Sequence, residues 1–141
     1  MSFTLHGLPV SSGIAIGHAH LVSHTSLEVA HYAIPKHGVA DEVARLDHAL
    51  ETTRAELSAL REHRPLQAAA EFDAFIDLHL MILADEHISH AAREMVKEEH
   101  CNAEWALKVQ MDDLVLQFEA FDDAYLRERK TDVVQVVERI L

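Results

Sequence analysis

The sequence predicts an all-α fold, a helical bundle of about five helices in packed antiparallel hairpins, preceded by a short extended N-terminal segment. Two observations carry this prediction. All 4 glycines lie within the first 38 residues, and no glycine or proline follows Pro65, so an irregular head precedes a long helical body. Within that body apolar residues recur at the spacing of an amphipathic helix.

The head contains the run GLPVSSGIAIGHAHLV, which combines turn-forming Gly and Pro with an Ile-rich stretch. This pattern predicts one β-strand near residues 14–22. A single strand cannot form a sheet by itself. We therefore expect residues 1–25 to belong to an α/β domain whose other strands lie outside this chain, and residues 26–141 to form the helical domain.

The helical body divides into segments at capping residues. The first helix follows Pro35 and ends near Pro65, because proline interrupts a helix. A second helix begins at Glu71, Asp85 and Asn102 are expected N-caps of the next two, and Asp122 and Asp123 open the last. Apolar stripes on these helices predict inward-facing side chains, among them Leu46, Leu50, Leu57 and Leu60, then Leu107, Met111, Leu114, Phe118 and Phe121, and finally Tyr125, Leu126, Val133, Val137 and Ile140.

The helix that begins at Glu71 carries apolar residues on two opposite sides. With successive residues 100° apart, the core stripe is Phe72, Phe75, Ile76, His79 and Leu83. The far side holds Glu71, Ala74, Leu78, Met81, Ile82 and Asp85. Five acidic residues and no Lys or Arg lie between Pro65 and Ala92. This second face favours a basic partner that also offers apolar contacts.

Composition narrows the class of protein. The chain has 141 residues, 49% of them hydrophobic, which is typical of a folded globular domain. A net charge of −12 argues against nucleic acid or an anionic membrane as partner. No apolar run is long enough to span a bilayer, the first 35 residues contain no Lys or Arg, and Cys101 is the single cysteine. We expect a cytoplasmic protein with a partly buried, inert thiol.

Chemical signatures are few. We find no Gly-rich phosphate loop, no GxSxG and no spaced cysteine set, and we name no catalytic residue and no cofactor for this chain. Twelve histidines leave a metal-binding helical module as an alternative, with His87, His90 and His100 as ligands, although solvated surface histidines are favoured. His79 is expected to be a hydrogen-bonded structural residue. A third alternative is an interaction domain that oligomerises through the face around Met81.

Three segments together resemble enzyme I of the bacterial phosphoenolpyruvate-dependent sugar phosphotransferase system. They are PVSSGIAIGHA, LHLMILADEHI and DDAYLRERKTDVVQVVERIL. Their order and spacing extend the similarity over nearly the whole chain. The resemblance implies a part of a phosphoenolpyruvate-protein phosphotransferase whose helical domain docks the histidine phosphocarrier protein. A nitrogen-regulatory or multiphosphoryl-transfer relative remains an alternative.

The resemblance also implies where the chemistry lies. The family's phosphorylated histidine occurs in a Gly-Gly-x-x-Ser-His motif, which these 141 residues do not contain. We therefore expect the fragment alone to bind the carrier and to be inactive. For the intact enzyme the resemblance implies magnesium and a homodimer formed through a C-terminal domain.

The family's docking surface can be carried over position by position. Leu78 stands where the family has glycine, and His79 matches a helix histidine whose role is local hydrogen bonding. The expected partner-binding residues are Glu71, Ala74, Leu78, His79, Met81, Ile82, Asp85, Glu86, Phe118 and Arg129.

Overall fold

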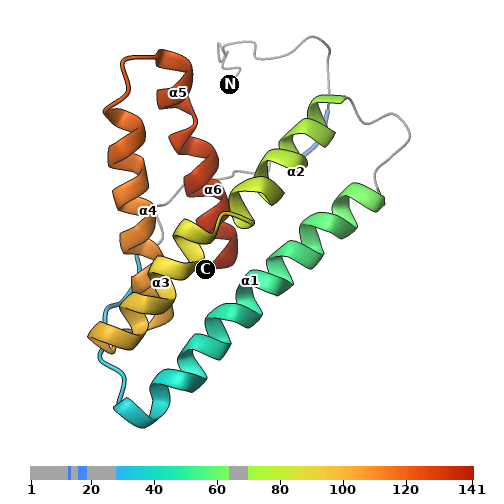
Figure 1. Cartoon of the computed structure of the whole chain (residues 1–141). Helices are drawn as coiled ribbons and strands as arrows, with labels where there is room; N and C mark the ends of the chain where they lie inside the picture. Colours follow the sequence, from blue (N-terminus) through green and yellow to red (C-terminus); the bar gives the residue numbers. More distant parts are fainter. Residues whose placement is uncertain (1–12, 14–15, 19–27, 64–69) are drawn as a thin grey trace, which may run out of the picture.

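The computed structural model describes residues 13, 16–18, 28–63 and 70–141, and among them it is helical without a β-strand (Figure 1). The all-α prediction is confirmed. The elements are η1 (Lys36–Gly38), α1 (Val39–Glu62), α2 (Ala70–Leu83), α3 (Glu86–Glu99), α4 (Ala103–Glu119), α5 (Ala124–Glu128) and α6 (Lys130–Ile140). Most of the strand predicted near residues 14–22, and most of the proposed 1–25 domain, lie outside the described residues.

The helices pack as antiparallel hairpins. The long helix α1 runs beside both α2 and α3, which follow one another back along it (Figure 1). Helix α4 returns against α3, and α6 returns against α4 while also contacting α2. The bundle therefore brings the end of α2 close to α4 and α6, three elements that are distant in sequence.

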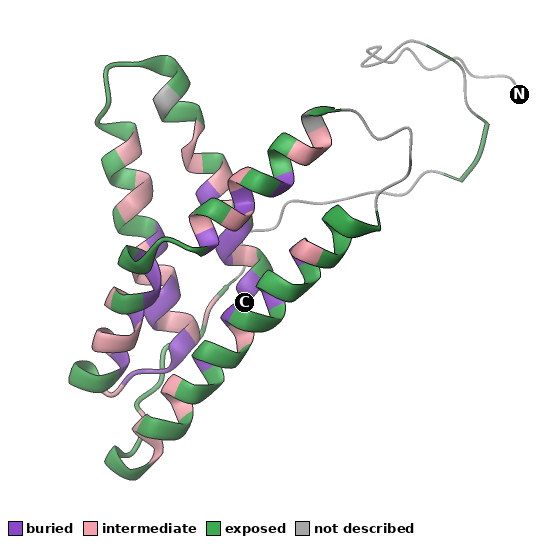
Figure 2. Cartoon of the chain, turned by 45° about the vertical axis from the view of Figure 1, so that its right-hand side comes forward, coloured by how far each residue is buried: buried purple, intermediate pink, exposed green. Residues whose placement is uncertain are grey.

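The core lies where these helices converge (Figure 2). Burial of each large aliphatic side chain contributes about 1.5–3 kcal/mol. The side chains at 2% exposure or less include Leu46, Leu57, Ile76, Val96, Leu107, Val136 and Val137. None of the helices in the described ranges is long and apolar enough to cross a membrane.

Some positions of the predicted apolar stripes point to solvent instead. Leu60, Phe75, Phe121 and Tyr125 are 44%, 44%, 46% and 61% exposed. Leu60 lies in the last turn of α1, Phe121 lies in the α4–α5 connection, and Tyr125 lies near the start of α5. At these hairpin ends the helical spacing of apolar residues continues, but the neighbouring helix that would cover them does not. Phe75 lies at the edge of its stripe, where its ring is covered only partly by His79 at a centroid distance of 3.9 Å.

Helix starts follow the capping predictions with two corrections. Asp85 Oδ1 accepts a hydrogen bond from the His87 N–H at 2.9 Å and caps α3. Asp123 Oδ1 accepts one from the Tyr125 N–H at 2.7 Å at the start of α5. The single last helix that we predicted is divided at Arg129 into α5 and α6. Asn102 occupies the N-cap position of α4, but its side chain caps nothing there.

The Asn102 side chain instead holds the segment that precedes the helices. Its Oδ1 accepts a hydrogen bond from the Tyr32 N–H at 3.1 Å, and its Nδ2 donates to the Ala30 carbonyl oxygen at 3.0 Å. Ala33 and Cys101 form an antiparallel β-bridge beside it. We call residues 30–34 the strap, because they lie across the α3–α4 junction.

An ion-pair network joins α1 to α4 beside the strap. Arg45 contacts Glu42 at 2.5 Å and Glu104 at 2.6 Å. The Glu42 carboxylate accepts the Ala103 N–H at 2.8 Å, and so caps α4 in place of Asn102. The hydrogen bond from Arg45 lowers the pKa of Glu104 to about 2. The start of α4 is thus positioned by α1.

Candidate docking site

A groove of about 530 Å³ opens between the end of α2, the second half of α4 and the α5–α6 segment. Most of its lining is apolar, with carboxylates and one guanidinium among the polar groups. We call this surface the apolar groove. Its lining residues are Leu78, Met81, Ile82, Asp85, Ile88, Leu114, Phe118, Tyr125, Arg129, Asp132 and Val133.

The apolar groove gathers six of the ten residues expected to bind the partner. Four of them belong to the second face of α2 and the turn that follows it, and two come from later helices. Because α4 packs against α3 and α6 packs against both α4 and α2, residues about 40 positions apart line one hollow. The six are Leu78, Met81, Ile82, Asp85, Phe118 and Arg129.

The other four expected residues lie elsewhere or are not described. Ala74 is exposed on α2 outside the groove lining, and the side chain of Glu71 is outside the description. Glu86 lines a separate depression on the side of α1. His79 is only 3% exposed, and its Nδ1 donates a hydrogen bond to the Phe75 carbonyl oxygen at 2.7 Å. His79 therefore supports α2 from the inside, in agreement with the structural role expected for it.

Met81 is the most prominent apolar group of the groove. Its side chain is 64% exposed although it is large and hydrophobic. Burial of an exposed thioether chain in an interface is favourable, and methionine adapts its shape to different partners. The groove thus offers a flexible apolar contact at its rim.

Arg129 is held in place at the α5–α6 junction, which forms another part of the groove lining. Its guanidinium lies 4.4 Å from the centre of the Tyr125 ring, donates to the Tyr125 hydroxyl and contacts Asp132 at 3.0 Å. The hydrogen bond with Tyr125 raises the pKa of Arg129. A fixed cation at this position can bind a carboxylate or a carbonyl group of a partner.

Five groove residues were not expected there, namely Ile88, Leu114, Tyr125, Asp132 and Val133. Sequence spacing predicted that Leu114, Tyr125 and Val133 face inward, and Val133 is buried at 4% exposure while it also borders the groove. Only Leu114 of these five lies on α4, whereas the others belong to α3, α5 and α6. Their meeting in one hollow depends on how the helices pack, which the spacing along one helix does not indicate.

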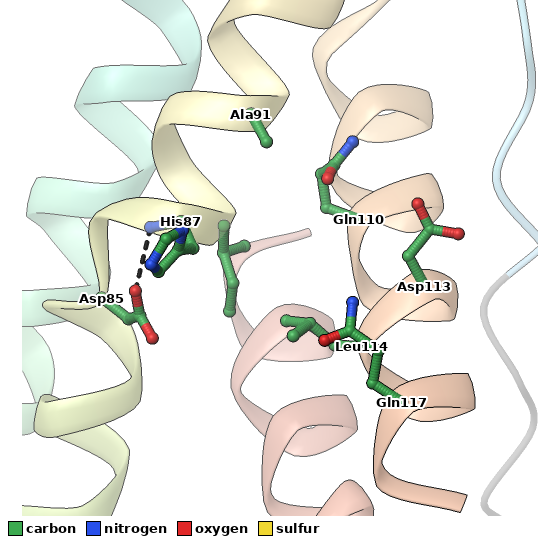
Figure 3. Close-up of a pocket in the computed structure, with 8 residues that line it drawn as sticks. Asp85, His87, Ala91, Gln110, Asp113, Leu114 and Gln117 are labelled. Atoms are coloured by element: carbon green, nitrogen blue, oxygen red, sulfur yellow. Dashed lines mark hydrogen bonds between the residues drawn. The ribbon is translucent and has the colours of Figure 1, made fainter. Parts of the chain in front are cut away.

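A second, polar pocket of about 340 Å³ continues from the apolar groove between α3 and α4 (Figure 3). The two hollows share Asp85, Ile88 and Leu114. The polar pocket is completed by His87, Ala91, Gln110, Asp113 and Gln117.

Metal-ligand geometry is missing from the described part of the chain. No group of three or more His, Cys, Asp or Glu side chains there could hold a metal ion. His87 and His90 are exposed on α3, whereas His100 lies at its far end. The arrangement gives the metal-binding alternative no support.

The described part of the chain is a helical domain with an apolar groove edged by acidic groups. The family model described as PEP-utilising enzyme, N-terminal, matches residues 6–129. The chain belongs to this family.

Curated relatives place the chain more narrowly. It is 48% identical over 141 residues to the phosphoenolpyruvate-protein phosphotransferase of Cupriavidus necator and 35% identical to that of Geobacillus stearothermophilus. The alignments cover 100% and 98% of this chain but 24% of each relative. The chain thus spans about a quarter of the length of the curated relatives it matches.

Solved structures show the same likeness. One is titled a solution structure of Enzyme I (nEIt) protein, with a TM-score of 0.73 and 26% identity. Another, titled N-terminal domain of Enzyme 1 - Nitrogen, has a TM-score of 0.71 and 28% identity. Each alignment covers 80% of this chain and 46% of the solved one. The helical unit resembles the N-terminal domain of enzyme I proteins.

Proposed function

We propose that this chain is the carrier-docking part of a phosphoenolpyruvate-protein phosphotransferase. In this proposal the apolar groove binds the histidine phosphocarrier protein of the phosphotransferase system. The observation that carries it is the convergence of Leu78, Met81, Ile82, Asp85, Phe118 and Arg129 on one hollow. The family resemblance implies that these residues bind the partner, and they come from separate segments of the chain.

Charge supports a basic partner. The chain has a net charge of −12, and Asp85 and Asp132 lie among the apolar groove walls. Complementary charge speeds the encounter of two proteins, while an apolar contact at the centre of the interface supplies most of the affinity. A carrier with an apolar patch surrounded by Lys and Arg fits both requirements.

The reaction of the whole enzyme belongs to the same proposal. Phosphate would pass from phosphoenolpyruvate to a histidine outside these 141 residues and then to the histidine of the carrier. Phosphoryl transfer depends on in-line positioning of donor and acceptor. The docking part contributes by holding the carrier at a high effective concentration near the donor.

Other features of the whole enzyme are proposals from the resemblance alone. They are homodimerisation through a further domain and a cytoplasmic location. Magnesium is the cofactor implied for the intact enzyme, but the described residues do not fit it, because they hold no suitable group of three ligands.

The test is a titration of the ¹⁵N-labelled 141-residue chain with the carrier of the same organism, followed by amide resonances. We expect the largest shifts at groove residues of α2 and its following turn. Met81→Asp places a charge in the apolar contact and should weaken binding by about 2 kcal/mol or more, which is roughly thirtyfold. Absence of shifts in residues 71–86 at millimolar carrier would refute the proposal.

Leu116→Asp is the matched control. Leu116 is also 64% exposed and apolar, but it does not line the groove. The proposal requires that Leu116→Asp binds the carrier with nearly the affinity of the wild-type chain. Sedimentation of the wild-type chain and of Met81→Asp separates docking from self-association, because only an oligomer formed through the Met81 face would lose mass in the variant.

A further inference from the structure

Five of the eight residues that line the polar pocket between α3 and α4 lie outside the apolar groove. Asp85, from the α2–α3 turn, lies on one side of it, and Asp113 lies on the α4 side (Figure 3). No Lys or Arg among the described residues forms an ion pair with either carboxylate, and none lines the pocket. Asp85 uses only Oδ1 to cap α3. Both carboxylates can therefore accept hydrogen bonds from a partner.

The α4 wall presents its polar groups on one face. Gln110, Asp113 and Gln117 are three, four and seven residues apart, the spacing that aligns side chains along a helix. The amide carbonyl groups of the glutamines are further acceptors. An ammonium or guanidinium group would find hydrogen-bond acceptors here, whereas an anion would be repelled by the carboxylates.

The position of the pocket indicates which cationic group can reach it. It continues directly from the apolar groove through Asp85, Ile88 and Leu114. A partner seated in the groove therefore places its adjoining surface over the pocket. We propose that the polar pocket receives a lysine or arginine side chain of the docked carrier, with Asp113 as its principal acceptor. The proposal rests on the proposed function.

Substitutions at Asp113 test the pocket. Asp113→Asn keeps the shape and removes the charge, and it should weaken carrier binding two- to fivefold by isothermal titration, about the value of one exposed ion pair. Asp113→Lys should weaken binding at least about tenfold through repulsion. Raising the salt concentration should reduce both differences. Measurements at pH 8 remove the contribution of protonated histidines.

Asp112→Asn is the matched control, because it changes the net charge of the same helix by the same amount. Asp112 pairs with Lys108 at 2.5 Å and does not line the pocket. We expect Asp113→Asn to weaken binding more than Asp112→Asn does. Equal effects of the two variants would show that binding responds only to the long-range attraction of the negative charge on the chain. That result would overturn the pocket proposal.

The outcomes of the two proposals can be told apart. If the wild-type chain does not bind the carrier, the proposed function itself fails. If Met81→Asp weakens binding while both Asp113 variants bind like the wild type, the docking function stands and the cation pocket is refuted. Amide shifts at residues 110–117 that disappear in Asp113→Lys would support the pocket independently of the affinities.

Discussion

Replacement of Asn102 by alanine should destabilise the fold more than any other single polar change near the strap. The Asn102 side chain is 1% exposed and makes three hydrogen bonds. Two join it to the backbone of Tyr32 and Ala30, and the third runs from Nδ2 to the Glu104 carboxylate at 3.0 Å. Alanine removes all three and leaves a gap at the α3–α4 junction.

The size of the expected loss in the free energy of unfolding follows from the kinds of hydrogen bond that alanine removes. A neutral hydrogen bond contributes about 0.5–1.5 kcal/mol and one to a charged group about 1.5–3 kcal/mol. Tyr32 and Ala30 belong to an exposed segment, so water replaces part of what their backbone groups lose. We expect the free energy of unfolding to fall by about 2–4 kcal/mol.

Urea denaturation followed by circular dichroism measures that loss, and fluorescence reports on the strap. Trp105 is the single tryptophan, and its ring stacks on His31 at a centroid distance of 4.6 Å. Its emission should change in Asn102→Ala even without denaturant. Gln135→Ala, an exposed change on α6, should stay within about 0.5 kcal/mol. A loss below about 1 kcal/mol with unchanged emission would refute the reasoning.

Three further predictions concern the interior and its edges. The folded pKa of Glu104, about 2, lies below its usual 4.5, so its stabilising effect is complete above that usual value and is lost as the pH falls toward 2. Arg45→Met should lower stability at pH 7 by about 1 kcal/mol and flatten this acid dependence in urea titrations. Cys101 is 1% exposed and burial raises the pKa of its thiol, so a thiol reagent should label the folded chain at least about tenfold more slowly than the urea-unfolded chain. His79→Ala should cost about 2–4 kcal/mol by urea denaturation yet weaken carrier binding less than Met81→Asp does.

Features set by a few neighbouring residues could be predicted from the sequence. The cap at Asp85 needs only its own carboxylate and the N–H two residues on. The two faces of α2 follow from helical geometry alone, which is why Ile76 is buried and Met81 is exposed. Such local rules also located the helices, because Pro65 separates the first from the second and no glycine or proline follows it.

Features that depend on how helices cross could not be predicted in this way. Tyr125 has the spacing of a core residue, but it lies beyond the crossing and lines the groove instead. Phe118 and Arg129 were associated with α2 only through the family resemblance. Asn102 was expected to cap α4, yet its side chain bonds residues about 70 positions earlier. Tertiary packing decides whether such a side chain forms hydrogen bonds with a local or with a distant backbone group.

The strap has a consequence for how the chain folds. Its bonds to Asn102 close a loop of about 70 residues that contains α1, α2 and α3. Closing such a loop from the unfolded chain costs about 4 kcal/mol of entropy, whereas each helical hairpin closes over a much shorter distance. The hairpins should therefore form first, and the strap should add its bonds after the rate-limiting step. Loss of the Asn102 side chain should then accelerate unfolding and leave the refolding rate nearly unchanged.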